Sequence, residues 1–306
     1  MNRVLVPYDF SPHSRRAAAL AMQGFPFGQD AEIELLHVVD EALYENVLAI
    51  KYVPDDESID SYLADDLLRV QAELAVAHGQ HSELPQLIEP RRTIARGRPY
   101  QIIEERMREP EMVGALLGGQ GHGGVTERVL GRTAQRVLRH AAIPVLVVKH
   151  PHSLALPARL MTAVDWSENS ARALLIAARL ADEVEGLLSV LHVIESPYVP
   201  YVKAFAHERD AREALQPLHD KQLARLARFV SETLAQLGPE SQVPESLTEA
   251  VVFGDPAKAI AAQAAALLAE LIVVGAHGSA NLSRFLLGST AERLVTAANS
   301  DILVVP

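Results

Sequence analysis

Residues 269–290 read AELIVVGAHGSANLSRFLLGST: an apolar, β-branched run precedes three glycines, and a Ser-Thr pair then opens a helical pattern. Residues 118–133, GGQGHGGVTERVLGRT, are an altered copy of the glycine-rich part. A buried strand that ends in glycines and leads into a helix is typical of folds in which parallel strands alternate with helices. The two stretches therefore predict a repeated α/β unit.

The rest of the chain supports a duplication. RVLVPYDFSPHSRRAAALA near the start matches RLMTAVDWSENSARALLIAA from Arg159, and AAIPVLVV matches ANSDILVV. Five landmark pairs keep their order and lie 155 to 157 residues apart: Asp9–Asp165, His37–His192, Pro99–Pro256, Gly118–Gly275 and Gly131–Gly288. A near-constant offset indicates two copies of one domain. We expect the domains at residues 1–150 and 158–306, joined by the proline-containing KHPHSLALPAR.

Composition narrows the class of protein. The 306 residues carry a formal net charge of −11, which argues against a nucleic-acid partner, because such proteins concentrate Lys and Arg. The chain has no Cys, which excludes disulfides and thiolate chemistry and fits a reducing compartment. MNRVLVPYDF lacks the apolar core of a signal peptide, and no apolar run approaches the length of a membrane span. We expect a soluble, cytoplasmic protein.

The apolar pattern predicts the fold class. Short apolar runs without clean alternation alternate with helical patterns, as expected for parallel strands covered on both faces. In the first copy the expected strands are Val4–Tyr8, Ile33–Val39, Leu87–Ala95, Val113–Leu117 and Pro144–Val148. Apolar helix faces are expected at Leu63, Leu67, Val70, Leu74 and Ala77, and at Leu223, Leu226, Val230, Leu234 and Leu237. The fold class is α/β, with two tandem, doubly wound, parallel five-stranded sheets of the Rossmann-like kind.

The site prediction follows from this topology. Ligands of such sheets bind beyond the carboxyl ends of the strands, where the strand order reverses, so Asp9 and Asp165 should lie beside the glycine loops. Glycine lets a ligand approach the backbone without a Cβ clash, and Ser289, as the expected N-cap of a helix, favours an anion. Together these features predict a phosphate cradle. The alternative is that the glycines only form a turn and Ser289 only caps a helix.

Other phosphate motifs fit poorly. No G-x4-G-K-[ST] segment is present, so no lysine of that kind reaches a phosphate. Gly119, Gly121 and Gly124 spell G-x-G-x-x-G, but they follow the fourth strand, and no acidic residue lies about 20 residues further on to hold a ribose. We interpret that match as chance.

At this point the chain resembles the universal stress protein family in its tandem two-domain form. VPYDFS and AVDWSENS, LLHVVD and VLHVIE, GSTAERL, and the closing PVLVV and ILVV carry the resemblance over nearly the whole chain. The spacing G-x2-G-x9-G-[ST] is the family's ATP-binding signature. The resemblance implies a fold similar to that of the adenine-nucleotide alpha hydrolases, and ATP, ADP or AMP, with or without Mg²⁺, as the ligand. It places adenine beside Asp165 and the backbone around Val193, and the phosphates on Gly275, Gly278, Gly288, Ser289 and Thr290.

Assembly is also implied by the resemblance. Family members pair through their last strands, so residues 143–148 and 301–305 are expected to pair within one chain as a built-in dimer. A further dimer of such chains is compatible with this arrangement, and the sequence names no protein partner.

The first copy departs from the family pattern. Gly118, Gly121 and Gly131 keep the glycine spacing, and Asp9 and Val38 remain in place, but Arg132 stands where the second copy has Ser289, with Thr133 after it. An arginine can hold a phosphate through a charge-assisted fork. Its bulk, or a pairing with Glu127, can equally close the site. We expect a weakened or altered first site.

Three functions remain open. The leading hypothesis is a stress-response regulatory module that binds adenine nucleotide and hydrolyses ATP slowly at most. A true ATPase or nucleotidyl transferase is the second, and a nucleotide-free dimerisation scaffold is the third. Adenylyl-transferring enzymes of this general fold carry H-x-G-H or S-G-G-x-D-S segments, whereas the corresponding stretches here read YDFSPHSRR and VDWSENSAR. No catalytic or metal-binding residue is predicted.

Several histidines have ordinary explanations. His37 and His192 are expected to be hydrogen-bonded core residues, and His122 and His277 solvent-facing loop residues. His140, His150 and His152 lack the spacing and companion carboxylates of a metal site. Residues 40–60 are interpreted as a surface excursion. Trp166, the single tryptophan, is expected to pack under the strand end while Asp165 faces the ligand, because neighbouring side chains of a strand point to opposite sides.

Overall fold

The computed structural model describes residues 2–40, 54–78, 86–121, 130–195, 208–237, 243–244, 246–278 and 287–306. The chain divides into two compact units, Met1–Leu156 and Pro157–Pro306, and each is treated by itself. Most of the surface excursion expected at residues 40–60, and His122, lie outside the described residues.

Strands and helices alternate along the first unit. Its elements are β1 (Arg3–Pro7), α1 (Pro12–Met22), β2 (Glu32–Val39), α3 (Asp56–His78), β3 (Arg91–Arg96), α4 (Pro99–Met107), β4 (Met112–Gly118), α5 (Arg132–Arg139) and β5 (Val145–Val148). The strands lie in the order β3-β2-β1-β4-β5, and every neighbouring pair is parallel.

The second unit repeats the arrangement. Its elements are β6 (Arg159–Val164), α6 (Glu168–Glu183), β7 (Leu187–Ile194), α8 (Glu208–Leu234), β8 (Leu247–Phe253), α9 (Pro256–Ala266), β9 (Leu271–Gly275), α10 (Ser289–Ala297) and β10 (Asp301–Val305). The order β10-β9-β6-β7-β8 is the same topology read from the other edge, again with parallel pairs. The predicted fold class, with its parallel five-stranded sheets, is confirmed.

The strand order explains how the helices cover each sheet. In the first unit the chain steps outward from β1 to β3, then returns to β4 and continues to β5. Right-handed crossovers therefore put α1 and α3 on one face and α4 and α5 on the other. The contacts agree, because α1 packs beside α3 and α4 beside α5, and likewise α6 beside α8 and α9 beside α10. The strand order reverses between β1 and β4, and between β6 and β9, where ligands of such sheets bind.

Burial explains why the strands lack alternation. The three central residues of β1 and residues 114–117 of β4 are buried, and both strands contact α1 on one face of the sheet and α4 on the other, as expected for strands packed between two helical layers. On α3, Leu63, Leu67, Val70 and Leu74 are buried as predicted, but Ala77 is exposed. On α8, Leu226, Val230 and Leu234 are buried, while Leu223 is half-buried and Leu237 lies beyond the end of the helix.

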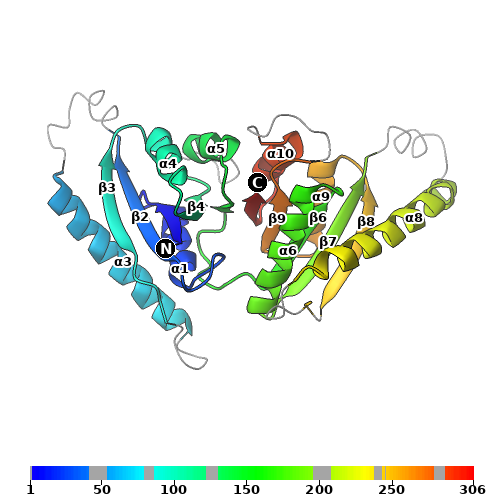
Figure 1. The fold of residues 1–306 in the computed structure, drawn as a ribbon, viewed down its shortest axis with the longest axis horizontal. Coiled ribbons are helices and arrows are strands. Elements are labelled where there is room, and N and C mark those ends of the chain that lie inside the picture. Colours follow the sequence, from blue (N-terminus) through cyan, green and yellow to red (C-terminus); the bar gives the residue numbers. More distant parts are fainter. Residues whose placement is uncertain are drawn as a thin grey trace. The chain divides into compact units, whose positions relative to one another are not determined.

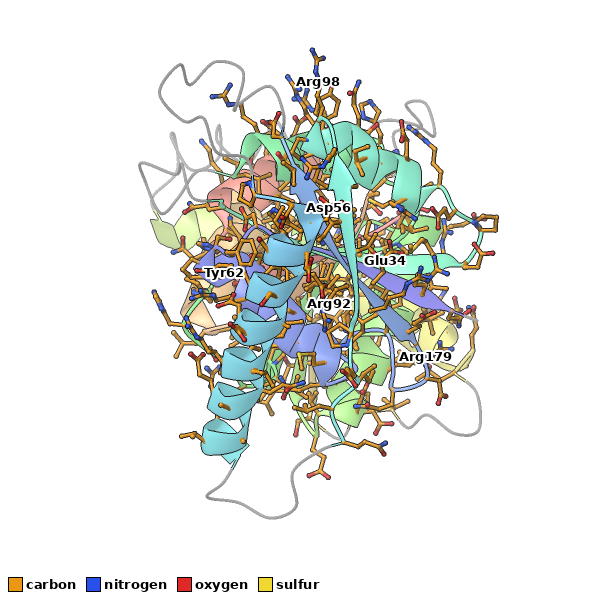
Figure 2. All side chains as sticks on the ribbon, turned by 90° about the vertical axis from the view of Figure 1, so that its left-hand side faces the viewer. Glu34, Asp56, Tyr62, Arg92, Arg98 and Arg179 are labelled. Atoms are coloured by element: carbon orange, nitrogen blue, oxygen red, sulfur yellow. The ribbon has the colours of Figure 1, made fainter. Side chains whose placement is uncertain are left out.

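The third strand starts later than predicted. It begins at Arg91 instead of Leu87, since the preceding segment crosses to α1, where the Ile88 N–H donates to the Met22 carbonyl at 2.8 Å. Pro90 has no N–H to contribute to a sheet. The edge strand is held to α3 by exposed ion pairs, Arg92 with Asp60 at 2.8 Å and Arg96 with Asp56 at 2.6 Å. Figure 2 labels one residue of each pair, Arg92 on β3 and Asp56 on α3.

The longest helices lie beside the edge strands, α3 along β3 and α8 along β8 (Figure 1). Within the described part of the chain, no helix combines the length and the apolar character needed to cross a membrane.

Candidate functional site

The first strand of each unit ends in a carboxylate that organises the next turn. In the second unit, Asp165 accepts hydrogen bonds from the Ser167 N–H at 3.2 Å and the Ser167 hydroxyl at 2.5 Å. Ser167 in turn caps α6 by accepting from the Ser170 N–H at 3.2 Å. In the first unit, Asp9 accepts from the Ser11 N–H at 3.1 Å, and Ser11 caps α1. The D-x-S pattern of both copies therefore builds the same turn at the strand end.

The glycines make room for the protein's own atoms. A Cβ on Gly275 would stand 2.9 Å from the Asn169 carbonyl carbon, at the start of α6. On Gly278 it would stand 2.5 Å from Asp165 Oδ2, and on Gly288 2.9 Å from the Ala276 carbonyl oxygen. The interpretation that these glycines mainly admit a ligand is therefore incomplete: they allow the loop, the carboxylate and the helix start to meet at one point.

The first copy repeats these contacts. A Cβ on Gly118 would lie 3.0 Å from the Ser14 nitrogen, and one on Gly121 would lie 2.7 Å from Asp9 Oδ2. Gly131 is looser, with its nearest atom, the Gly119 carbonyl oxygen, at 3.4 Å. In both copies the glycine that precedes the last helix donates its N–H back to the loop at 2.7 Å. The N–H of Gly288 is therefore bonded within the protein, and the phosphate contact expected at this glycine stays a prediction.

The last helix of the second unit begins one residue earlier than a serine cap would require. The N-cap is Gly288, and Ser289 is the first helical residue, so the prediction that Ser289 caps the helix is wrong. The reason is local: Gly288 has extended backbone angles, and its carbonyl accepts from the Glu292 N–H at 2.9 Å. The N–H groups of the first turn have no partner within the helix, which leaves them available to an anion. Within the described residues the Ser289 hydroxyl makes no hydrogen bond.

The second unit has a cavity of about 530 Å³ at this point. It gathers every residue predicted for the second site: Asp165, Val193, Gly275, Gly278, Gly288, Ser289 and Thr290. Pro256 and Ile260 of α9 add an apolar wall beside Val193. The structure thus brings the predicted residues together from β6, β7, β9 and α10, and their role in binding stays a prediction.

The first unit has a matching cavity of about 600 Å³. It gathers the residues named for the altered site: Asp9, Val38, Gly118, Gly121, Gly131, Arg132 and Thr133. Arg132 is the first residue of α5, after the N-cap Gly131, and is exposed. Glu127, its suggested partner, lies outside the described residues. The choice between a phosphate-holding and a blocking arginine stays open.

The cavity of the second unit also contains residues that the sequence did not reveal. Trp166 lines it directly, because the residue has a left-handed φ of 69° and so does not follow the alternation of the strand. The expectation that the indole packs away from the site is therefore wrong. Its ring lies 4.2 Å from the His192 ring and 4.3 Å from the Arg225 guanidinium. Gln222 of α8 lines the same cavity. The only sign of this in the sequence is that Gln222 lies one helical turn before the core residue Leu226 and so on the same side of the helix.

The histidines divide into two groups. His37 and His192 are hydrogen-bonded strand residues, as predicted, with Nδ1 at 2.7 Å from the Tyr8 carbonyl and 2.8 Å from the Val164 carbonyl. His277 was expected to face solvent, but it lines the cavity, and its Nε2 is buried without a hydrogen-bond partner among the described residues. Within the described ranges, no group of three His, Asp or Glu residues could hold a metal ion, and His140 contacts Glu104 instead.

Burial gives His192 a pH-dependent role in stability. Burial lowers the pKa of His192, and the nearby Arg225 lowers it further, against the opposing effects of the Val164 carbonyl and Asp165. The folded state therefore favours the neutral ring. The stabilisation that this gives is fully present above about pH 6.5, the pKa of histidine in the unfolded chain, and is lost as the pH falls through the lower pKa of the folded state. We expect the melting temperature to fall as the pH drops below that value, and His192→Gln to reduce the dependence. His152→Gln, at an exposed position, is the control. An unchanged pH profile in the His192 variant would contradict this assignment.

Comparison with known proteins identifies the family. The model of the universal stress protein family matches twice, over residues 1–149 and 158–306. The chain belongs to the universal stress protein family. A universal stress protein of Mycobacterium tuberculosis is 28% identical over 214 residues, covering 67% of this chain and 65% of the relative. The match thus spans slightly less than two thirds of that relative.

Solved universal stress proteins share the fold. One from Archaeoglobus fulgidus is 20% identical, with a TM-score of 0.58, and the alignment covers 99% of this chain and 98% of that one. A putative universal stress protein from Pseudomonas aeruginosa is also 20% identical, with a TM-score of 0.59, covering 100% and 93%. At this identity the likeness extends to the fold alone. Both copies of this chain are thus universal stress domains, and the ligand must be argued from the cavities.

Proposed function

We propose that this universal stress protein binds an adenine nucleotide, ATP, ADP or AMP, in the cavity of its second unit, and acts as a stress-response regulatory module. The observation that carries the proposal is the union, in one cavity, of an open helix N-terminus with a strand-end carboxylate and an apolar wall. Phosphates would lie at Ser289 and Thr290, where the first turn of α10 offers N–H and hydroxyl donors. The base would lie toward Val193.

The chemistry of the cavity favours binding over turnover. Asp165 and Glu195 are the carboxylates that line it within the described residues, and Asp165 already accepts hydrogen bonds from Ser167. Mg²⁺, when bound with the phosphates, would neutralise part of their charge. We therefore expect slow ATP hydrolysis at most. A slow ATPase or nucleotidyl transferase, and a nucleotide-free scaffold, are the alternatives. Pairing of residues 143–148 with 301–305, and a cytoplasmic location, stay predictions.

The decisive experiment is to denature the purified protein and measure any nucleotide released per chain. An adenine nucleotide retained at a fixed ratio, or bound with a saturable isotherm on addition, supports the proposal. Neither retention nor binding in calorimetry with ATP, ADP and AMP would leave the scaffold as the function. Release of many product molecules per chain, lost with Asp165→Ala, would favour the enzyme.

Replacing Ser289 by alanine is expected to weaken adenine-nucleotide binding at the second site by about tenfold to a hundredfold. The hydroxyl would donate to a charged phosphate, a hydrogen bond worth about 1.5–3 kcal/mol. Because Gly288, and not Ser289, is the N-cap, the melting temperature without nucleotide should stay unchanged. Calorimetry and thermal melts of the same variant check both parts. Unchanged affinity would remove Ser289 from the site.

The two cavities are expected to differ in affinity, with the second filling first at limiting nucleotide. Arg132 stands at the helix start where the second copy has Ser289, and both residues line their cavities. Arg132→Ser should raise the affinity of the first site if the arginine blocks it, and lower it if the arginine holds phosphate. A titration that shows two identical sites per chain in the native protein would contradict the asymmetry.

A further inference from the structure

One polar group in the second cavity is unexplained by the glycine loops and the helix start. Gln222 lines the cavity from α8, and its Oε1 is buried with no hydrogen-bond partner among the described residues. A buried carbonyl left unpaired has lost its water without compensation, which is unfavourable unless another donor reaches it. At the wall of a cavity, that donor can come from a ligand.

The packing of α8 shows which end of the cavity Gln222 occupies. Its neighbours on the helix, Arg225 and Phe229, contact the indole of Trp166 at 4.3 and 5.4 Å. The helix packs against α6, whereas α10 packs against α9, on the opposite face of the sheet. A phosphate on the first turn of α10 therefore leaves the other part of the nucleotide for Gln222.

The chemistry of the amide selects among the parts of a nucleotide. Phosphate oxygens only accept hydrogen bonds from the protein, so they cannot satisfy a carbonyl. Adenine presents an N6 amine as donor and N7 as acceptor, and a glutamine amide can pair with both at once. Guanine presents acceptors at both O6 and N7, and these leave the amide carbonyl unpaired. We propose that Gln222 reads the base in the second cavity and selects adenine over guanine, an assignment that rests on the proposed function.

The first copy has no glutamine at the position that corresponds to Gln222. Asp66 stands at the equivalent position, 156 residues before Gln222, the same offset that separates Asp9 from Asp165. Its buried carboxylate accepts from the Tyr8 hydroxyl at 2.6 Å and from Arg15 at 2.7 and 2.9 Å. Burial and the hydrogen bond to Asp66 raise the pKa of Tyr8, which keeps the phenol protonated as a donor. The acceptor atoms are thus committed to the protein, and base selection is a property of the second unit.

The test uses the full chain and the single tryptophan, which lines the second cavity and is not among the residues that line the first. Trp166 fluorescence and calorimetry follow titrations with ATP, GTP, 2′-deoxy-ATP and 7-deaza-ATP, the last of which has no N7 acceptor. The native protein is expected to bind ATP about tenfold to a hundredfold more tightly than GTP, the discrimination typical of one bidentate amide–base pair. Gln222→Met keeps the length of the side chain and should lose most of that ratio, while ATP and 7-deaza-ATP become equivalent.

A matched control separates recognition from structure. Gln216 is an exposed amide on the same helix, bonded to Asp220 at 2.8 Å, and Gln216→Met should leave all affinities unchanged. Without nucleotide, Gln222→Met should melt at the native temperature or higher, because it removes an unpaired buried amide. A variant that keeps the native preference for ATP over GTP overturns the proposal. So does one that loses only the discrimination between ATP and 2′-deoxy-ATP, since the amide would then contact the ribose. Native protein that binds none of the nucleotides overturns both this assignment and the proposed function.

Discussion

Gly275→Ala is expected to destabilise the second unit and to weaken nucleotide binding there at least tenfold. The added methyl would stand 2.9 Å from the Asn169 carbonyl carbon and 3.1 Å from the Ser170 nitrogen. These are backbone atoms at the start of α6, so relief requires the end of β9 to separate from the helix. Overpacking of this kind costs about 1–3 kcal/mol. The same movement would displace Asp165, since its N–H donates to the Ser170 hydroxyl at 3.3 Å.

Denaturant unfolding and nucleotide titration of the same preparation measure both effects. Gly118→Ala is the matched control in the first unit, where the corresponding contact is 3.0 Å, to the Ser14 nitrogen. It should perturb the first cavity and leave the fluorescence response of Trp166 to nucleotide intact. If Gly275→Ala retained native stability and affinity, the close approach of β9 to α6 would not explain why glycine occupies this position.

Asp165→Ala is expected to abolish the saturable change in Trp166 fluorescence that ATP produces. The indole lines the cavity between His192 and Arg225, so a ligand there should alter its surroundings. Asp165 faces the same cavity, and its bonds to Ser167 hold the turn in which Trp166 adopts a φ of 69°. Left-handed backbone is costly for a bulky residue and persists only where its surroundings enforce it. Loss of the carboxylate therefore removes a site wall and the support of the turn, and we expect affinity to fall about a hundredfold or more, equivalent to about 2.7 kcal/mol.

The first unit provides the control for this variant as well. Phe10 occupies the position of Trp166 and also has a left-handed φ, of 62°. Asp9→Ala therefore removes the same strand-end carboxylate from the first unit and leaves the surroundings of the Trp166 indole unchanged. The fluorescence response should survive Asp9→Ala with a stoichiometry near one per chain. A response that disappears with Asp9→Ala and survives Asp165→Ala would show that the nucleotide binds in the first unit, and not in the second as proposed. A reporter that stays silent in native protein, while calorimetry detects binding, would mean that the ligand leaves the surroundings of the indole unchanged.

Much of the architecture could be predicted because its signals are local. Apolar runs, the glycines that end β4 and β9, and the near-constant repeat offset predict two doubly wound sheets of parallel strands. Sheets of that class bind ligands at a switch point, and Asp9 and Asp165 lie beside the glycine loops, as expected. Each of these inferences needs only the period of the side chains and the rules of chain connection.

Three features of the site depended on contacts that spacing along the chain does not encode. The serine next to the last glycine was expected to be the helix cap, but Gly288, with its extended backbone and its carbonyl bonded to the Glu292 N–H, is the cap, and Ser289 lines the cavity as the first helical residue. Trp166 faces the cavity because of one backbone angle. Gln222 lines the cavity from α8, a helix whose Arg225 and Phe229 pack against Trp166.

The sequence by itself therefore determined the duplicated fold, the family and the strand ends at which a ligand would bind. Only the tertiary structure decided which side chains from distant elements face that point, and which of their polar atoms are already paired. The physical reason is that strand and helix periods are set by neighbours in the chain. The pairing of a buried amide or the room for a Cβ is set by atoms brought there by packing, from helices many residues away.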